Sequence, residues 1–339
     1  MKGQRLAEEN VKVSILLPIK NAEETLEETI LTIITQDFTD FELLCIVAPS
    51  QDNSHSIARN WASTDSRIKV FLDITSSGIA GQCNYGLSFA KGKYIAICNA
   101  DDLNMPNRLC AQVNFLERHA DVGVLGSDVL TFGKTETYWR MPSDSEEIKA
   151  TMLFRGAVAN PSAMFRSSIL IENNIKYDES FESAAEDLDF WVRLSKVTKI
   201  QNLNFPLIRY RIWDRQATNV NANSMLQNAA RVRLKLLGEL GIESFDENIG
   251  LHEAIANNES GLSKKQVMSW FEEITIRNQT YKVYDDEFLR LILERELFRI
   301  FTRNPISQSG RVYRFEWISK LLSKMPLTLK IKIARLMGM

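Results

Sequence analysis

YIAICNADDLNMPNRL, from Tyr94 to Leu109, passes from an apolar run into a polar loop and then towards an amphipathic segment. The apolar run has the composition of a buried strand, and it ends abruptly at Asn99, with Asp101 and Asp102 directly behind. Neighbouring carboxylates repel each other unless a cation or a positive partner offsets the repulsion. The stretch therefore predicts either a metal site at the end of a strand or an acidic turn that caps the next helix.

On both sides of this stretch, segments typical of strands alternate with segments typical of helices. The expected strands are 13–19 (VSILLPI), 41–48, 67–73, 94–98 and 122–132, and the expected helices are 23–35, 54–63, 81–90 and 105–119. Ser54 is expected to be an N-cap. Continuous apolar strands separated by helices are typical of βαβ units, so this part is expected to form a mostly parallel α/β sheet.

Three polar clusters follow three of these strands. They are Lys20-Asn21, 50–53 and 99–102. Ligands of parallel α/β sheets bind at the carboxyl ends of the strands. The clusters therefore predict a binding crevice along one edge of the sheet.

Beyond residue 140 the pattern changes. A helix start at Ser143 or Ser145 is followed by the strand-like NPSAMFRSSIL, the helical FESAAEDLDFWVRLSK and the strand-like NLNFPLIRYRI. From about residue 220 every amphipathic segment has helical spacing. We therefore expect two domains, an α/β domain over 1–220 and a helical C-terminal region over 221–339.

Composition excludes several classes of protein. The chain has 339 residues, 45% of them hydrophobic, and 41 basic against 43 acidic residues, so a nucleic-acid partner is not expected. It contains no apolar run long enough to span a bilayer and no secretory leader, which predicts a cytoplasmic protein. The four cysteines lack CxxC spacing, which predicts reduced thiols and no zinc site.

Motifs narrow the function further. GxGxxG, GxxxxGK[ST] and GxSxG are all missing, which disfavours dinucleotide enzymes, P-loop kinases and α/β-hydrolases. A second acidic group, Glu186, Asp187 and Asp189, stands at the start of an amphipathic helix. Such acids either complement the helix dipole or supply a general base, because burial and nearby charge can raise a carboxyl pKa towards the working pH.

Several widely spaced blocks resemble, in the same order, family 2 glycosyltransferases of the GT-A fold. They are VSILLPIKNAEETLEETILTIITQDFTDFELLCIV, RIKV, GLSFAKGKYIAICNADDLNMPNRLCAQVNFLE, NPSAMFRSSIL, YDESFESAAEDLDFWVRL and YRIWDRQAT, which cover about residues 11–220. The resemblance implies the Rossmann-like α/β sheet of nucleotide-diphospho-sugar transferases. The helical tail is more loosely similar to that of bacterial surface-polysaccharide members.

The resemblance implies a metal-dependent, inverting transfer of a sugar from a nucleotide diphosphate, usually UDP, to an acceptor hydroxyl. The family's DxD motif falls on residues 99–101, which makes Asp101 the ligand of Mn²⁺ or Mg²⁺ and Asn99 a donor contact. The family's catalytic base falls on Asp187, with Glu186 beside it. Further donor contacts are expected at Pro18, Asn21, Asp52 and Arg108, and Trp191 and Trp213 are candidates for the acceptor side.

Three positions depart from the family pattern. The segment VAPSQDNS is one residue shorter than the usual VDDGSTDNS, so Ala48-Pro49 replace the acid that contacts the base or ribose. Asn99 replaces the first aspartate of DxD, and Trp213 stands where a histidine often follows YRI. The chain is therefore either an active enzyme with altered nucleotide contacts or a degenerate paralogue that binds nucleotide sugars or acts as a scaffold. Retention of Asp101 and of EDLDFW favours activity.

The segment after the first expected strand and the C-terminal tail give two further expectations. A nucleotidyltransferase on a similar sheet is disfavoured, because IKNAEE is not a glycine-rich, basic phosphate loop. In residues 311–339, basic side chains alternate with apolar ones against the single acid Glu316. This tail would either lie on the inner face of an anionic membrane, near a lipid-linked glycan acceptor, or pack on its own domain.

Overall fold

The computed structural model describes residues 11–73, 78–181, 184–214, 216 and 222–302. The chain divides into two compact units. The first comprises residues 1–136, 141–145 and 158–229, and the second comprises 137–140, 146–157 and 230–339. The basic tail over 311–339, with its predicted membrane contact, lies outside the described residues.

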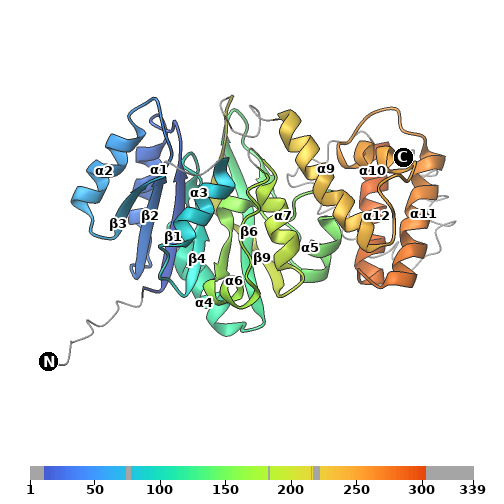
Figure 1. Ribbon diagram of the computed structural model, residues 1–339, viewed down its shortest axis with the longest axis horizontal. Helices are drawn as coiled ribbons and strands as arrows, with labels where there is room; N and C mark the ends of the chain where they lie inside the picture. Colours follow the sequence, from blue (N-terminus) through green and yellow to red (C-terminus); the bar gives the residue numbers. More distant parts are fainter. Residues whose placement is uncertain (1–10, 74–77, 182–183, 215, 217–221, 303–339) are drawn as a thin grey trace. The chain divides into compact units, whose positions relative to one another are not determined.

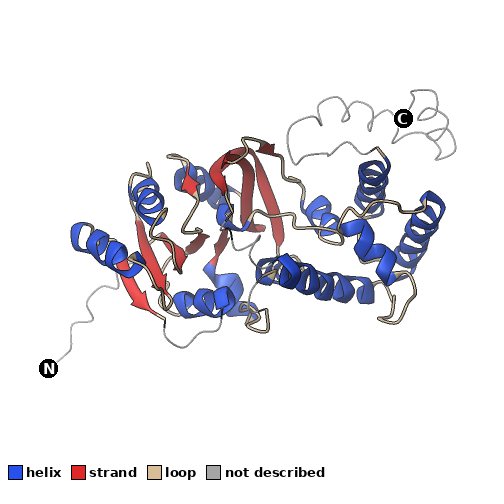
Figure 2. Ribbon diagram, turned by 90° about the horizontal axis from the view of Figure 1, so that it is seen from above, coloured by secondary structure: helices blue, strands red, loops and turns tan. Residues whose placement is uncertain are grey.

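A mixed sheet forms the centre of the first unit (Figures 1 and 2). Its strands follow the order β3-β2-β1-β4-β8-β6-β9-β5. Their bounds are β1 Val13–Ile19, β2 Phe41–Val47, β3 Ile68–Leu72, β4 Tyr94–Ile97, β5 Leu103–Asn104, β6 Val122–Gly133, β8 Met164–Arg166 and β9 Lys199–Ile212. The helices are α1 Leu26–Ile34, α2 Ser54–Thr64, α3 Gly78–Leu87, α4 Arg108–Arg118, α6 Ser167–Asn173 and α7 Glu186–Leu194, with the 3₁₀ helix η1 Asn160–Ser162.

The apolar runs become buried parallel strands, as the sequence predicts. β1 lies between β2 and β4 and is parallel to both, and every residue of β2 is buried. Pro18 is tolerated within β1 because the pairing with β4 ends at Leu16, so this end of the strand has a neighbour on one side only. Only part of the sheet is parallel, because β8 runs antiparallel to β4 and β6, and β5 runs antiparallel to β9.

One local prediction was wrong. Ser54 is the first residue of α2, and Asn53 is its N-cap. The Ser54 hydroxyl instead accepts a hydrogen bond from the Ala22 backbone N–H at 2.8 Å and donates one to Asp52 Oδ1 at 2.6 Å. The serine therefore links the loop after β2 to the loop after β1.

The second unit is mainly helical. It contains α10 Ile249–Ala256, α11 Lys264–Tyr281 and α12 Asp286–Phe301, with the short strand β7 Tyr138–Trp139. Two further helices, α5 Ser145–Thr151 and α9 Ala222–Glu239, each begin in the first unit and continue into this one. His252 is fully buried here, where its Nε2 contacts the Leu153 carbonyl at 2.9 Å and its Nδ1 accepts from Trp270 Nε1 at 3.2 Å.

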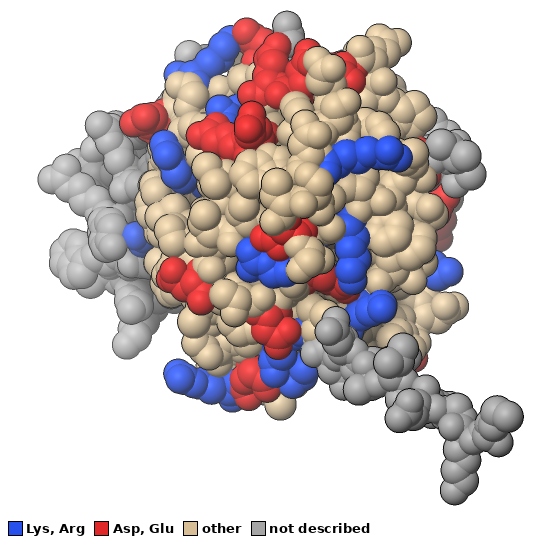
Figure 3. Space-filling view, turned by 90° about the vertical axis from the view of Figure 1, so that its left-hand side faces the viewer, with Lys and Arg blue, Asp and Glu red and all other residues tan. Residues whose placement is uncertain are grey.

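The surface carries charges of both signs. On the face drawn in Figure 3, acidic and basic side chains are interspersed with uncharged ones, in keeping with a net charge of −2. Among the helices that the structure describes, none is both long and apolar enough to cross a bilayer.

Candidate active site

Hydrogen bonds from the C-terminal end of β9 hold the loop that carries Asp101 and Asp102. β9 pairs with β5 directly after the loop, which brings Arg211 alongside it. The Arg211 backbone N–H donates to Asp102 Oδ1, and its Nε donates to the Asp101 carbonyl, both at 2.8 Å. The Arg211 guanidinium also pairs with Glu28 of α1 at 2.6 Å. The loop is therefore anchored to a strand about a hundred residues further along the chain.

Helix α1 and its N-cap residue also hold this loop. The Thr25 hydroxyl donates to the Ala100 carbonyl at 2.8 Å, and the Thr29 hydroxyl donates to the Asp102 carbonyl at 3.0 Å. Both threonines are buried. Hydrogen bonds from α1 and from β9 therefore hold the loop backbone in place.

Asp101 and Asp102 have different surroundings. Asp102 is 2% exposed, and its two oxygens accept from Arg211 N and, at 2.9 Å, from Asn99 Nδ2. Burial and the charge of Asp101 raise the pKa of Asp102 well above its usual range. Asp101 is half-buried, and its Oδ2 accepts from Trp213 Nε1 at 3.0 Å. Asp102 therefore supports the loop, and Asp101 is the carboxylate that a ligand can reach.

The residues fit a cation that takes few ligands from protein. The described part of the chain holds no cluster of three or more His, Cys, Asp or Glu side chains suited to a metal. In the loop after β4, Asp102 is buried, so Asp101 is the residue that offers an accessible carboxylate. The Oδ1 atom of Asp101 accepts no hydrogen bond from another described residue. Mg²⁺ and Mn²⁺ are often bound by one or two carboxylates, with substrate phosphates and water completing the shell. Burial raises the pKa of Asp101, and the hydrogen bond from Trp213 opposes this rise.

The expected donor contacts Asn21 and Asp52 lie in the loops after β1 and β2, and hydrogen bonds join these two loops. Asn21 has a left-handed backbone, with φ of 49°. Its N–H donates to Ser50 Oγ at 3.1 Å, and its Oδ1 accepts from Gln51 N at 2.9 Å. Asp52 Oδ2 accepts from Glu23 N at 3.0 Å. These bonds make the two loops one rigid rim, beside which Pro18 is half-buried.

Arg108 does not lie at the surface where a donor contact was expected. It is fully buried at the start of α4, and its guanidinium makes five hydrogen bonds. The acceptors are Gln112 Oε1, Cys98 Sγ, Asn104 Oδ1 and the carbonyls of Ile97 and Ala163. Because a guanidinium has five N–H donors, none is left for a nucleotide. We therefore assign Arg108 to the core that supports the loop.

The second acidic group stands at the first turn of α7. Ala185, its N-cap, has φ of 63°, which is unusual for a residue other than glycine. Burial and the charge of Asp187 raise the pKa of Glu186 to about 8, and burial raises the pKa of Asp187. Asp189 instead forms an ion pair with Arg193 at 2.7 Å. Two of the three acids are therefore buried carboxyls with raised pKa values, and the third forms an ion pair within the helix.

The two tryptophans have different environments. Trp191 is 1% exposed, and its ring packs edge-on against Phe165 and Phe190. It therefore has no free face for an acceptor, contrary to the expected acceptor-side position. Trp213 is half-buried and contacts Asp101 through its indole N–H. That contact places it at the loop that carries Asp101, a position that the sequence did not predict.

Sequence reasoning also missed Arg211, which lies inside the block YRIWDRQAT without being singled out. A basic residue next to the predicted end of a strand was a usable signal. Its partners, however, depend on the pairing of β5 with β9. The short strand β5 has only two residues and could not be predicted from an apolar run.

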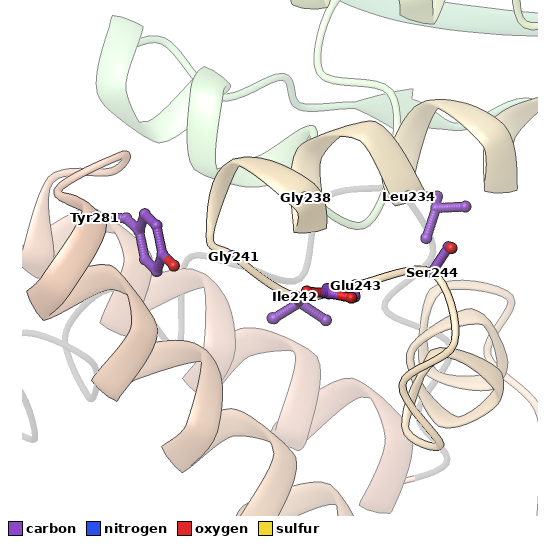
Figure 4. Close-up of a pocket in the computed structure, with 7 residues that line it drawn as sticks. All are labelled: Leu234, Gly238, Gly241, Ile242, Glu243, Ser244 and Tyr281. Carbon is purple, nitrogen blue, oxygen red and sulfur yellow. The ribbon is translucent and has the colours of Figure 1, made fainter.

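A separate hollow lies in the second unit, between α9 and α11 (Figure 4). It has a volume of about 600 Å³ and is lined by Leu234, Gly238, Gly241, Ile242, Glu243, Ser244 and Tyr281. None of the expected site residues lines it. Figure 4 shows the Tyr281 ring directed towards the turn at Gly241.

Comparison with known proteins identifies the family of the chain. Residues 14–172 match the model of the family described as glycosyl transferase family 2. An uncharacterized glycosyltransferase of Methanocaldococcus jannaschii is 30% identical over 215 residues, which are 60% of this chain and 71% of that protein. A GalNAc(5)-diNAcBac-PP-undecaprenol beta-1,3-glucosyltransferase of Campylobacter jejuni is 28% identical over 245 residues, 70% of this chain and 74% of that protein.

Two solved structures share the fold. TarS 1–349 of S. aureus in complex with UDP-GlcNAc has a TM-score of 0.53 at 16% identity, covering 84% of this chain and 90% of that one. The mannosyltransferase PcManGT of Pyrobaculum calidifontis, in complex with GDP-Man and Mn²⁺, has a TM-score of 0.52 at 16% identity, covering 86% of this chain and 88% of that one.

Proposed function

Since the chain belongs to glycosyl transferase family 2, we propose that it moves a sugar from a UDP-sugar to a hydroxyl group of a lipid-linked glycan, with inversion and with the help of Mn²⁺ or Mg²⁺. The chain is a glycosyltransferase with the α/β GT-A fold, as the sequence predicted. The observation that carries the finer proposal is the anchored loop, in which Asp102 is buried and Asp101 is reachable. The undecaprenol-linked acceptor in the name of the Campylobacter jejuni relative supports a lipid-linked acceptor.

In this proposal Asp101 binds the cation, and the half-buried side chain of Asn99 contacts the donor beside it. The bound cation would neutralise negative charge that develops on the diphosphate leaving group. The rigid rim at Asn21 and Asp52 contributes to the donor site next to Pro18. The complex of PcManGT with GDP-Man and Mn²⁺ supports this arrangement by analogy.

Asp187 acts as the general base in this proposal. The assignment to Asp187 follows the resemblance, and burial and the charge of Asp187 raise the pKa of Glu186 beside it. The ionised Asp187 takes the proton of the acceptor hydroxyl as that oxygen attacks the anomeric carbon and the bond to the diphosphate breaks. Glu186 keeps its proton and limits the negative charge at the start of α7. The domain division at residue 220, the cytoplasmic location and the contact with a membrane remain predictions.

A transfer assay tests the proposal. The full chain is incubated with UDP-, GDP- and dTDP-sugars and a panel of lipid-linked acceptors, with and without Mn²⁺, and compared with Asp187→Asn. We expect transfer from UDP-sugars that depends on Mn²⁺ and falls about 100-fold or more in Asp187→Asn. Donor binding without turnover over the whole panel, or full activity of Asp187→Asn, would contradict it.

A further inference from the structure

The hydrogen bond between Trp213 and Asp101 has no role in the reaction described so far. Trp213 follows the last residue of β9, and its Nε1–H donates to Asp101 Oδ2 at 3.0 Å. The position of Trp213 is itself fixed, because its backbone N–H donates to Gln216 Oε1 at 3.4 Å. The Gln216 side chain in turn donates to the Arg211 carbonyl. The indole is therefore held by the same segment that holds the loop.

This contact fixes how the Asp101 carboxylate is turned. The loop backbone is anchored through the Asp101 carbonyl and through Asp102, so the carboxylate can still rotate about its side-chain bonds. The indole N–H removes that freedom by engaging Oδ2. The opposite oxygen, Oδ1, accepts no hydrogen bond from another described residue. An indole N–H can donate but cannot coordinate a metal, so its effect on a cation must pass through Asp101.

We propose that Trp213 is a positioning residue for the divalent cation: its indole N–H orients Asp101 so that Oδ1 is presented as a single, preoriented ligand. This inference rests on the proposed function, in which Asp101 binds the cation. Hydrogen-bond partners of metal ligands affect metal affinity by about 10- to 100-fold. Because Asp101 lies at the donor's diphosphate in that proposal, Trp213 acts on the cation and not on the acceptor.

Trp213→Phe tests the inference because it keeps a ring and removes the N–H. Binding of Mn²⁺ to the full chain in the presence of UDP is followed by the electron paramagnetic resonance signal of free Mn²⁺. We expect the Kd for Mn²⁺ to rise about 10-fold. The Mn²⁺ concentration for half-maximal activity should rise to the same extent, while kcat at saturating Mn²⁺ changes by less than about twofold, since the bound ion still meets the same Asp101 oxygen.

Trp61→Phe is the matched control. It makes the same change in α2, where the ring packs against the core of the sheet, and it should leave the Kd for Mn²⁺ unchanged. A rise in Kd confined to Trp213→Phe supports the positioning role. Equal Kd values for Trp213→Phe and the wild type overturn it, and so does an equal rise in both variants.

Asp101→Asn separates this inference from the function on which it rests. Asparagine can still accept from Trp213 but loses the charge that attracts the ion. If Asp101→Asn abolishes Mn²⁺ binding and Trp213→Phe binds like the wild type, the positioning role is wrong and the proposed cation site stands. If Asp101→Asn binds Mn²⁺ like the wild type, the proposed cation site is wrong and the inference falls with it.

Discussion

The backbone N–H of Arg211 donates to Asp102 Oδ1 at 2.8 Å, although 109 residues separate the two along the chain. The other oxygen of Asp102 accepts from the Asn99 amide. The Asp102 side chain therefore links strand β9 to the loop after β4 through hydrogen bonds. The adjacent carboxylates at 101 and 102 are explained by a division of roles, since one supports the loop and the other remains accessible.

Asp102→Ala is expected to destabilise the protein. It leaves the Arg211 N–H and the Asn99 amide without their acceptor in a buried place, which costs about 1–3 kcal/mol in the free energy of unfolding. Urea unfolding monitored by circular dichroism measures this change. Asp101→Ala is the matched control, and we expect a smaller loss because Asp101 is half-buried. Equal losses would show that Asp102 does not anchor the loop.

Glu186→Gln is expected to remove a pH dependence of stability. Burial and Asp187 raise the pKa of Glu186 from an ordinary 4.5 to about 8 in the folded chain. The folded state therefore holds a proton that the unfolded state has lost between these values, so the stabilisation is complete below about pH 4.5 and is lost as the pH rises through 8. Relative to the wild type, Glu186→Gln should become steadily more stable over this range.

Urea midpoints at several pH values between 4.5 and 9 test this expectation. Glu27→Gln, on the exposed side of α1, should follow the wild-type curve at every pH. Parallel curves for wild type and Glu186→Gln would mean that Glu186 titrates normally.

Ala185→Gly should stabilise the protein or leave it unchanged. Ala185 has φ of 63°, a left-handed conformation that costs a non-glycine residue roughly 1 kcal/mol. Glycine removes that strain, and its greater freedom in the unfolded chain offsets part of the gain. Ala184→Gly has no such strain to relieve and should lose about 0.5–1 kcal/mol. The free energies of unfolding of the two variants decide the point, and an equal loss in both would contradict the assignment of strain.

Gly241→Ala should destabilise the helical unit by about 1 kcal/mol or more. Gly241 has φ of 69°, and an added Cβ would lie 2.2 Å from the Tyr281 hydroxyl. Gly238→Ala is the matched control, because it lies within α9 and its Cβ would meet no atom within 4 Å. Alanine has the higher helix propensity, so this variant should gain about 0.5–1 kcal/mol. Thermal unfolding distinguishes the two, and shifts of the same sign would refute the prediction.

The strands of the sheet could be predicted because burial leaves a direct trace in the sequence. β1 and β2 are continuous apolar runs, and their parallel pairing follows from the helix between them. The helices of the second unit could be predicted from amphipathic spacing. By contrast, β5 has two residues, and its pairing with β9 has no local signal.

The site could be predicted only in part, because residue type does not determine surroundings. As expected, Asp101 lies in a loop after a strand and Glu186 lies at the start of a helix. Arg108 was expected to bind a donor, because it matches the arginine that follows the metal motif in the family that the sequence resembles. The structure instead supplies five internal acceptors for it. Trp191 likewise belongs to the core. The contact of Trp213 with Asp101 depends on the pairing of β9 with β5, which has no local signal in the sequence.

The link between β9 and the Asp101 loop has a consequence for biosynthesis. A ribosome translates Asp101 long before it reaches Arg211 and Trp213, so a nascent chain has the carboxylate without the groups that orient it. Contacts between segments so far apart in sequence also form slowly during folding. The anchored form of the loop would therefore appear late in folding, and a fragment that stops at residue 172 would carry Asp101 without the contacts from Arg211 and Trp213.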